Sequence, residues 1–468
     1  MKLFHEGENY KLYQGTMLDL LKVIEPNSID SIVTDPPYGL TSITKRFGKE
    51  KSAPAQYGKD GSFPRLSKGF MGKLWDGSGI EYNIETWQKC YEALKPGGYL
   101  LAFGGTRTFH RIACAIEDAG FEIRDTIMWL YGSGFPKSMN IGLAIDKKNG
   151  IENKTGVIKK GVGNNNTDSQ SIYGLEFEER IAQNEWGGWG TTLKPSYEPI
   201  IVARKPFAGS LIDNIQEYGV GGLNIDECRV GDESHTVNIN DFSNQHGNQF
   251  GNREPIGKLG EKEVIGRYPA NTILTYDDTD FEEVCGGMPY TKSGIAVRHN
   301  SGGNTFGGNN KKPPMEDLGY EDSGSAARYF YCAKASTKDR DEGLDQFDYQ
   351  TVSDGRKTPI DNAFQRAETQ RKNTHPTVKP TELMQYLIRM VTPNGGTVLD
   401  PFNGSGSTGK AVMYENREKN KGYKYIGIDL EEEYLAISKA RIDYVNNIDK
   451  QSNLIKVNGV VYEELKLF

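Results

Sequence analysis

Hydrophobic positions follow the periods of strands and helices in alternation along two parts of the chain. Residues 29–34 and 99–103 are short apolar runs that predict buried strands, whereas residues 17–24 and 109–119 carry apolar positions at helical spacing. This alternation predicts β-α-β units, and hence an open α/β sheet with helices on its faces. Further elements are expected at 10–13, 82–94, 121–130, 199–204, 381–392, 396–399, 425–428 and 431–445.

Four long segments lack this periodicity. Residues 41–75 hold eight Lys and Arg against two acidic residues, which suits a phosphate-contacting loop, although a solvated loop explains the same charge. Residues 149–192 predict a flexible insertion, and residues 336–373 predict a polar linker. Residues 206–322 are rich in Asn, Gly and Asp and predict a separate irregular module. The predicted organisation is therefore 1–148, 149–205, 206–322 and 323–468.

Composition excludes several classes of protein. The 468 residues are 36% hydrophobic and 25% charged, which is ordinary for a soluble chain. No apolar run approaches membrane-spanning length, and the N-terminus lacks the form of a signal peptide, so we expect a cytoplasmic protein with no membrane partner. Five scattered Cys and six His show no zinc spacing, and we expect no metal. The net charge of -7 argues against a wholly basic nucleic-acid surface but leaves room for a local basic cleft.

A carboxylate, two prolines and an aromatic ring follow the strand at 29–34. Open α/β sheets place their ligands at the carboxyl ends of strands, where Asp35 stands. Pro36 and Pro37 restrict the backbone and carry no N–H, so the carbonyls beside them are left to accept bonds from a ligand. Together with the ring of Tyr38, these groups suit a planar amino group such as the exocyclic amine of a nucleobase. A Pro-Pro turn with a helix-capping Asp is the plainer alternative.

A glycine-rich loop follows the strand at 396–399 and opens the next helix. Gly404, Gly406 and Gly409 match the dinucleotide fingerprint G-x-G-x-x-G, in which glycines let a ligand approach the backbone at a helix N-terminus. Asp429, at the end of the next strand, is placed to bind ribose hydroxyls.

The residues around this loop narrow the choice of ligand. A P-loop is excluded because Ala411 stands where the magnesium-binding hydroxyl belongs. A dehydrogenase and an S-adenosylmethionine enzyme remain, since both bind an adenosine ribose in this way. Asp400 precedes the loop and would repel a pyrophosphate, whereas it could hold a cationic ligand. It therefore favours S-adenosylmethionine, which carries a sulfonium and an ammonium group.

Three motifs resemble those of site-specific DNA amino-methyltransferases. Asp-Pro-Pro-Tyr at 35–38 is similar to the catalytic motif, Asp-Pro-Phe-Asn-Gly-Ser-Gly-Ser-Thr at 400–408 to the cofactor motif, and His-Pro-Thr-Val-Lys-Pro at 375–380 to the motif of the leading helix. The catalytic half comes first, which is the permuted order called the β class. The resemblance implies a doubly wound, Rossmann-like methyltransferase sheet, circularly permuted. Along the chain, the implied order is a catalytic half at 1–148, an insertion with a returning strand at 149–205, a target-recognition module at 206–322 and a cofactor half at 323–468.

The resemblance implies methylation of a base that has been flipped out of double-stranded DNA. Tyr38 would stack on that base, while Asp35 and the Pro36 carbonyl would accept the two hydrogens of its amino group and free the nitrogen lone pair. Family members that methylate adenine N6 more often begin this motif with Asp or Asn, and those that methylate cytosine N4 more often with Ser. Asp35 therefore favours adenine.

The implied site residues fall into three groups. The catalytic group is Asp35, Pro36, Pro37 and Tyr38. The cofactor group is Thr16, Asp35, Lys379, Thr381, Asp400, Phe402, Gly404, Ser405, Gly406, Thr408 and Asp429. Thr16 stands where the family commonly has Asp, and Asp19 could substitute for it. The base pocket is Tyr38 with Trp129, Tyr131 and Phe135, which form an aromatic and glycine-rich strand end.

Other functions stay open at this point. They are an N4-cytosine methyltransferase, an NAD-dependent oxidoreductase and a DNA-binding protein with an inactive methyltransferase core. A fused nuclease is a weak further option, because Asp146 with Glu152 and Lys154 resembles a metal-nuclease pattern. Double-stranded DNA is the expected partner, and a homodimer and a separate restriction endonuclease are further partners to test.

Overall fold

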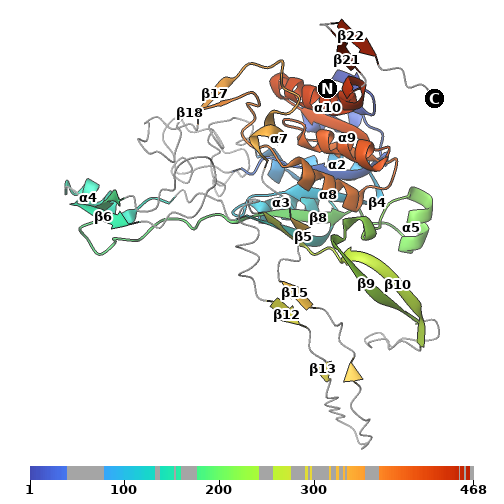
Figure 1. Cartoon of the computed structure of the whole chain (residues 1–468), viewed down its shortest axis with the longest axis horizontal. Coiled ribbons are helices and arrows are strands. Elements are labelled where there is room, and N and C mark those ends of the chain that lie inside the picture. Colours follow the sequence, from blue (N-terminus) through green and yellow to red (C-terminus); the bar gives the residue numbers. More distant parts are fainter. Residues whose placement is uncertain are drawn as a thin grey trace, which may run out of the picture. The chain divides into compact units, whose positions relative to one another are not determined.

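The computed structural model divides the chain into two compact units (Figure 1). The first comprises Met1–Trp129, Glu198–Leu274 and Arg328–Phe468, and the second comprises Leu130–Tyr197 and Thr275–Ala327. The structure describes residues 1–39, 79–131, 138–151, 154–159, 176–241, 257–275, 290–292, 296–297, 316–317, 323–325, 330–331, 335–353, 368–452, 454–457 and 460–463. The predicted basic loop at 41–75 and the base-pocket residue Phe135 lie outside these residues.

The first unit is built on a ten-stranded sheet with the order β1-β2-β20-β19-β3-β4-β8-β5-β11-β16. Neighbouring strands from β2 to β4 are parallel, whereas β8 runs antiparallel to β4. The predicted open α/β sheet is therefore confirmed. Its strands are β1 (Lys2–Gly7), β2 (Tyr10–Gln14), β3 (Ile29–Thr34), β4 (Leu94–Phe103), β5 (Glu122–Tyr131), β8 (Tyr197–Arg204), β11 (Thr272–Thr275), β16 (Phe330–Tyr331), β19 (Thr397–Asp400) and β20 (Lys424–Asp429).

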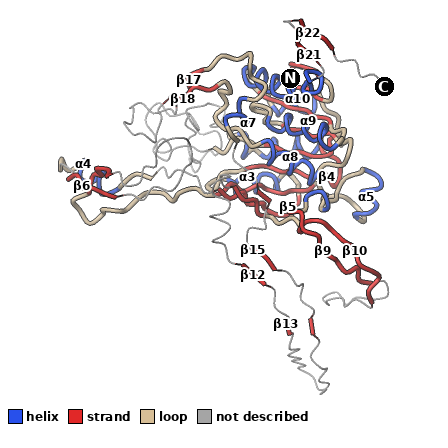
Figure 2. Tube along the Cα trace, viewed as in Figure 1, coloured by secondary structure: helices blue, strands red, loops and turns tan. Residues whose placement is uncertain are grey.

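Helices pack on both faces of this sheet (Figure 2). Ile32 on β3 shares a buried apolar cluster with Trp87 of α2 and Ile112 of α3. Its neighbour Ser31 points to the opposite face, where Ser31 Oγ lies 2.8 Å from Oγ1 of Thr392 at the end of α8. The helices of the first unit are η1 (Met17–Lys22), η4 (Ile80–Tyr82), α2 (Ile84–Ala93), α3 (Phe109–Asp118), α5 (Leu211–Tyr218), η5 (Asp226–Cys228), α7 (Thr337–Asp341), α8 (Thr381–Val391), α9 (Ser407–Lys419) and α10 (Glu432–Ser452).

Two-stranded sheets make up most of the remaining structure. The first unit contains β9 (Val230–Asp241) with β10 (Gly257–Arg267), β17 (Gln350–Ser353) with β18 (Glu368–Arg371), and β21 (Leu454–Val457) with β22 (Val460–Glu463). The second unit contains α4 (Ile141–Lys148), β6 (Lys154–Lys159) with β7 (Glu176–Ile181), β12 (Tyr290–Lys292) with β15 (Ser323–Ser325), and β13 (Ala296–Val297) with β14 (Glu316–Asp317).

The segment at 206–322 is divided between the two compact units, and its role as a target-recognition module stays a prediction. Residues up to Leu274 belong to the first unit because they bond to its sheet and helices. Asn214 Nδ2 on α5 donates to the carbonyl of Pro96 in β4 at 3.0 Å, and the Asn224 amide donates to the Met390 carbonyl in α8 at 2.9 Å. The loop-rich composition of this segment gave no indication of these contacts.

The polar segment at 336–373 is more than a linker, which corrects the sequence interpretation. It contains α7, β17 and β18. Leu344, just after α7, is fully buried against Tyr434 and Ile437 of α10. Leu344 stands among charged and polar neighbours, so the sequence pattern gives no indication that it is buried. Among the described residues, no helix is long and apolar enough to span a membrane.

Candidate active site

Three neighbouring parallel strands end in aspartate at one edge of the sheet. Asp35 follows β3, Asp400 ends β19 and Asp429 ends β20. Thr34 Oγ1 donates to Asp400 Oδ1 at 2.6 Å, so the end of β3 is bonded directly to the end of β19. The structure therefore brings together the two stretches, 35–38 and 400–408, that the sequence singled out.

The Asp35 carboxylate has one paired oxygen and one unpaired oxygen. Oδ2 accepts from Lys379 Nζ at 2.5 Å. Oδ1 is buried and has no hydrogen-bond partner within the described structure. Burial raises the pKa of Asp35, and the Lys379 ammonium opposes that rise. A buried acceptor without a donor is costly and marks a place where a ligand donor fits.

Lys379, a predicted cofactor residue, is buried between two carboxylates and two aromatic rings. Its side chain is 7% exposed, and its ammonium also lies 3.5 Å from Glu198 Oε2. The nitrogen lies over two aromatic rings, 5.3 Å from the Tyr38 centroid and 4.8 Å from the Phe103 centroid. Burial by itself lowers the pKa of Lys379, but the Asp35 and Glu198 carboxylates outweigh it and raise that pKa. The lysine therefore stays charged beside Asp35.

Glu198 is a site residue that the sequence analysis missed. It lies near the start of β8, and because β8 is antiparallel to β4, this start reaches the edge where β4 ends. The pairing of Phe103 with Ile200 places Glu198 two residues beyond the end of β4. The sequence indicated site residues by their position just after an apolar strand. Glu198 lies near the start of its strand, so the same pattern could not indicate it.

The Asp-Pro-Pro-Tyr segment is held by its aromatic residue. Pro36 and Pro37 are buried, and all described peptide bonds are trans. Tyr38 Oη donates to Glu198 Oε2 at 2.8 Å, and the Tyr38 carbonyl accepts from Tyr82 Oη at 2.9 Å. Tyr38 is thereby held at its ring hydroxyl and at its main-chain carbonyl, which suits a rigid surface for a planar ligand.

Asp400 bonds within the protein. Its Oδ1 accepts from Thr34 Oγ1 at 2.6 Å and from the Phe402 amide at 3.1 Å, and its Oδ2 accepts from Thr408 Oγ1 at 2.6 Å. Burial raises the pKa of Asp400 to about 6. A carboxylate offers about four acceptor positions, so three are filled by this network. Asp400 and Thr408 therefore tie the glycine loop to β3, and neither side chain points freely toward a ligand.

The glycines of the loop are required by close packing. Gly404 has φ +51°, and a Cβ there would lie 2.9 Å from His375 Nε2. Gly406 has φ +75°, and a Cβ there would lie 2.9 Å from the Cα of Ser438 on α10. Asn403 braces the loop, since its Oδ1 accepts from Tyr425 Oη at 2.8 Å. The loop backbone is therefore open to approach only from the side away from these contacts.

Gly406→Ala lowers the free energy of unfolding by about 2–4 kcal/mol, because it adds left-handed strain to a clash with the α10 backbone. Gly395→Ala is the matched control, since Gly395 has φ +76° but no heavy atom within 4 Å of the added Cβ. It costs strain alone, about 1–2 kcal/mol. Urea unfolding measures both variants, and equal losses would show that the contact with Ser438 is unimportant.

Asp429 and Thr16 bond locally where the sequence predicted ligand contacts. Asp429 Oδ2 accepts from the Gly404 amide at 2.7 Å, and its Oδ1 accepts from the Glu431 amide at 2.9 Å. Burial raises the pKa of Asp429 to about 7. Thr16 Oγ1 caps η1 by accepting from the Leu18 amide at 3.3 Å, while Asp19 pairs with Lys22 at 2.7 Å. Asp429 therefore shapes the glycine loop directly.

The remaining predicted cofactor residues also have internal contacts. Ser405 points to the buried Arg441, whose NH1 donates to the Ser405 carbonyl at 2.8 Å. The ring of Phe402 packs against Trp87 with centroids 6.3 Å apart. Thr381 Oγ1 donates to Asp339 Oδ1 at 2.5 Å. These side chains hold the site together, and ligand contacts in this region would fall largely to backbone groups.

Asp339 on α7 is a second residue that the sequence analysis missed. Its Oδ2 accepts from the Thr381 amide at 3.0 Å, which caps the start of α8, and its Oδ1 accepts from Lys410 Nζ at 2.8 Å. Lys410 is almost fully buried and also pairs with Glu342 Oε2 at 2.6 Å. The lysine of the near P-loop match is therefore a structural cation, which agrees with the exclusion of a P-loop.

Two of the predicted base-pocket aromatics besides Tyr38, Trp129 and Tyr131, lie among the described residues. Trp129 is buried and meets Phe103 edge-on, with centroids 6.4 Å apart. The ring of Phe103 in turn lies 4.8 Å from Lys379 Nζ. Tyr131 belongs to the second unit, where its amide donates to the Ser196 carbonyl at 2.8 Å. Trp129 thus packs against Phe103, and the base-pocket roles of Trp129 and Tyr131 stay predictions.

The nuclease pattern gains no support from the described residues. Asp146 is fully buried, and its two oxygens accept from the Gln183 amide at 2.7 Å and from Asn184 Nδ2 at 2.6 Å. Glu152 lies outside the described residues. Within the described part of the chain, no three His, Cys, Asp or Glu side chains are placed to hold a metal ion.

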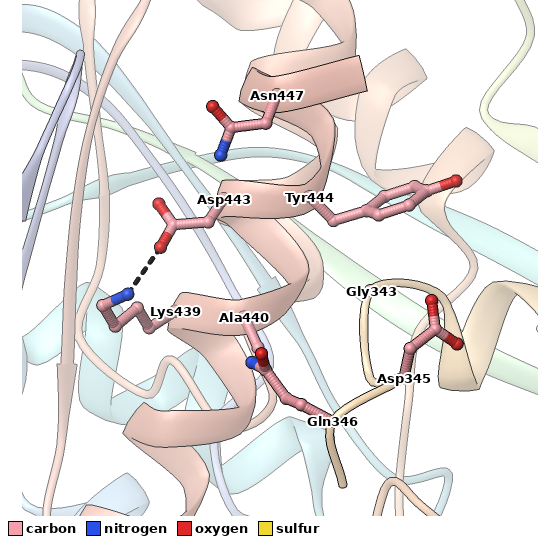
Figure 3. Close-up of a pocket in the computed structure, with 8 residues that line it drawn as sticks. All are labelled: Gly343, Asp345, Gln346, Lys439, Ala440, Asp443, Tyr444 and Asn447. Atoms are coloured by element: carbon pink, nitrogen blue, oxygen red, sulfur yellow. Dashed lines mark hydrogen bonds and ion pairs between the residues drawn. The ribbon is translucent and has the colours of Figure 1, made fainter. Parts of the chain in front are cut away.

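A cavity of about 300 Å³ lies away from these strand ends, between α10 and the loop after α7 (Figure 3). Lys439 and Asp443 of α10 form an ion pair at its wall, with Nζ and Oδ2 2.6 Å apart. None of the predicted site residues lines this cavity. The candidate site is therefore the strand edge around Asp35.

The fold and site define an α/β protein with an acidic motif and a glycine loop on adjacent parallel strands. The model of the DNA methylase family matches residues 29–440. The chain belongs to this family.

Curated relatives match shorter regions. The Type II methyltransferase M.HindIII of Haemophilus influenzae is 24% identical over 232 residues, which are 46% of this chain and 64% of the relative. The Type II methyltransferase M2.DpnII of Streptococcus pneumoniae is 43% identical over 72 residues, which are 15% of this chain and 25% of the relative. The chain thus matches less than two thirds of the length of either relative.

Two solved structures are similar over nearly the whole chain. The PvuII DNA methyltransferase (cytosine-N4-specific) is 13% identical and covers 96% of this chain and 95% of its own, with a TM-score of 0.39. The M1.HpyAVI–SAM complex is 15% identical and covers 93% and 99%, with a TM-score of 0.34. Scores this low carry no argument, so the fold rests on the sheet described above.

Proposed function

We propose that this chain transfers a methyl group from S-adenosylmethionine to the exocyclic N6 of an adenine flipped out of double-stranded DNA. The observation that carries the proposal is the buried, unpartnered Oδ1 of Asp35 beside the glycine loop of the neighbouring strand. Membership of the DNA methylase family supports DNA as the substrate. The homodimer and the separate restriction endonuclease stay predictions.

The glycine loop fits the proposed cofactor. At Gly404 and Gly406 an added Cβ would collide with His375 and Ser438, so only glycine lets the loop pack this closely against its neighbours. The acidic surroundings of Asp35 and Glu198 suit a cationic ligand. S-adenosylmethionine, when bound, supplies an electrophilic methyl group. Residues 404–408 and Asp429 would hold it through backbone groups and through the shape of the loop.

The residues of the chain would prepare the target amine. Asp35 Oδ1 and the Pro36 carbonyl accept its two hydrogens, which draws the nitrogen toward a tetrahedral geometry and exposes its lone pair. The amine loses one proton as it gains a methyl group, and Asp35 Oδ1 is placed to accept that proton. Stacking on the ring of Tyr38 contributes about 1–3 kcal/mol toward the cost of flipping the base.

We also propose the β-class order of the two halves. Residues 35–38 precede residues 400–408 in the chain, and β3 and β19, which lead into them, are adjacent and parallel. This pairing supports one shared site built from a catalytic half and a later cofactor half.

Incubation of the protein with DNA and methyl-deuterated S-adenosylmethionine is expected to give labelled N6-methyladenine. Mass spectrometry of the digested nucleosides measures the result. Labelled N4-methylcytosine would overturn the adenine assignment and keep the amino-methyltransferase class. Absence of label from both nucleosides, with the cofactor bound, would overturn the proposed function.

A further inference from the structure

Lys379 lies between two carboxylates, which are carried by strands that run in opposite directions. Its Nζ is 2.5 Å from Oδ2 of Asp35, which follows the parallel strand β3, and 3.5 Å from Oε2 of Glu198 on the antiparallel strand β8. The three groups together carry a charge of about −1 at neutral pH, given their ordinary ionisation. A buried ammonium needs a counter-ion at all times, because an unpaired buried charge is strongly destabilising.

Glu198 makes a second contact that fixes its direction. Its Oε2 accepts from Tyr38 Oη at 2.8 Å, so the oxygen that lies near the ammonium is also held by the tyrosine hydroxyl. The same side chain therefore controls the aromatic surface of the site and the charge beside Asp35.

We propose that Glu198 is a positioning residue, which acts on Asp35 by sharing the Lys379 ammonium and so allows Asp35 to accept a proton. This proposal rests on the proposed function. When Asp35 takes the proton of the target amine it becomes neutral, and Lys379 loses its nearer counter-ion. Glu198 then supplies the remaining negative charge, so no buried cation is left unpaired.

The charge of Glu198 also acts on Asp35 at a distance. Burial raises the pKa of Asp35, Lys379 opposes the rise, and the negative charge of Glu198 adds to it. Loss of that charge therefore makes Asp35 a weaker base. Among the described residues, the charged and titratable groups around Asp35 are Lys379, Glu198, Tyr38, Asp400, and Glu81 with Tyr82, whose side chains pack against Gly39.

Glu198→Gln tests the proposal, because an amide keeps an acceptor for the Tyr38 hydroxyl and removes the charge. Carbon-13 NMR titration of labelled Asp carboxyls, with the Asp35 signal assigned through Asp35→Asn, is expected to show a downward pKa shift of about one unit. In single-turnover methylation the acid limb of the pH–rate profile moves down correspondingly, and the plateau rate falls about three- to ten-fold. Glu198→Asp keeps the charge and restores most of both values. Affinity for S-adenosylmethionine is the check on folding.

Two further variants separate charge from structure. Tyr38→Phe removes the hydrogen bond between Tyr38 and Glu198 without changing the charge of Glu198. It should not lower the pKa of Asp35. Glu122→Gln removes a carboxylate that pairs with Arg204 at the other end of β8, 2.8 Å away, and it should leave the titration and the rate unchanged.

An unchanged pKa of Asp35 in Glu198→Gln overturns the proposal. So does a downward shift of that pKa in Tyr38→Phe equal to the shift in Glu198→Gln. A shifted titration with an unchanged methylation rate overturns the positioning role. If the titrations shift as expected but the wild-type protein methylates no DNA, the proposed function fails while the coupling between Glu198 and Asp35 stands.

Discussion

Asp35→Asn slows methyl transfer to DNA by about 10²- to 10⁴-fold, the range contributed by a positioned proton acceptor. The amide occupies the same volume but cannot accept a proton at the buried Oδ1 position. Glu198 remains 3.5 Å from Lys379 and keeps that cation paired, so the variant is expected to fold. Single-turnover rates with labelled cofactor measure the loss, and calorimetry should give an affinity for S-adenosylmethionine close to that of the wild type.

The matched control for Asp35→Asn is Asp30→Asn on the same strand. Asp30 is also buried and also pairs with a lysine, since its Oδ1 lies 2.6 Å from Lys95 Nζ, but it lies near the opposite end of β3. Asp30→Asn should lower stability and leave the methylation rate of the folded protein unchanged. Normal turnover in Asp35→Asn would rule out the proposed role of Asp35.

Asp339→Ala lowers the free energy of unfolding by about 3–5 kcal/mol, the cost of breaking a buried ion pair. The change removes a partner 2.8 Å from the buried Lys410 Nζ and leaves the Thr381 amide at the start of α8 without its cap. Urea unfolding at neutral pH measures the loss. Because α8 begins only two residues after Lys379, the methylation rate should fall as well.

The control for Asp339→Ala is Asp345→Ala, four residues after α7. Asp345 is 95% exposed and lies 3.6 Å from Lys372, so its loss should cost less than about 1 kcal/mol. Equal losses in the two variants would contradict the structural role of Asp339.

The contribution of Asp339 also depends on pH. Burial alone raises its pKa, but Lys410 and Thr381 outweigh burial and hold the pKa of Asp339 below its ordinary value. A depressed carboxyl pKa stabilises the fold above the unfolded value of about 3.9, and this stability is lost as the pH falls through the folded pKa. The difference between wild type and Asp339→Ala should therefore shrink in acid.

The sequence predicted the parts of the site that follow parallel strands. Asp35, Asp400 and Asp429 each come at the end of an apolar run, and the pairing of their strands brings them to one edge. The glycine spacing likewise predicted a tight loop at the start of α9. These features are local, so a pattern of residues close together in the sequence is enough to reveal them.

The sequence could not show contacts made by residues outside those patterns. Glu198 reaches the site because β8 is antiparallel to β4. The residues of β8 alone do not predict the direction of that strand. Asp339 stands among Lys338, Arg340 and Asp341, a run of charges that looks solvated, yet it caps α8. The contacts of Thr381 with Asp339 and of Lys379 with Asp35 were not predicted for the same reason, since the partners are distant in the chain.

The central claim is that Asp35 and the glycine loop of the neighbouring strand methylate an amino group in DNA. Single-molecule sequencing of DNA from cells that express the protein tests this claim directly, because it reports both the modified base and its sequence context. We predict N6-methyladenine at one recurring sequence in cells with the wild-type chain, and none in cells with Asp35→Asn. Unmodified DNA in cells that contain folded wild-type protein, or equal modification by Asp35→Asn, would contradict the account.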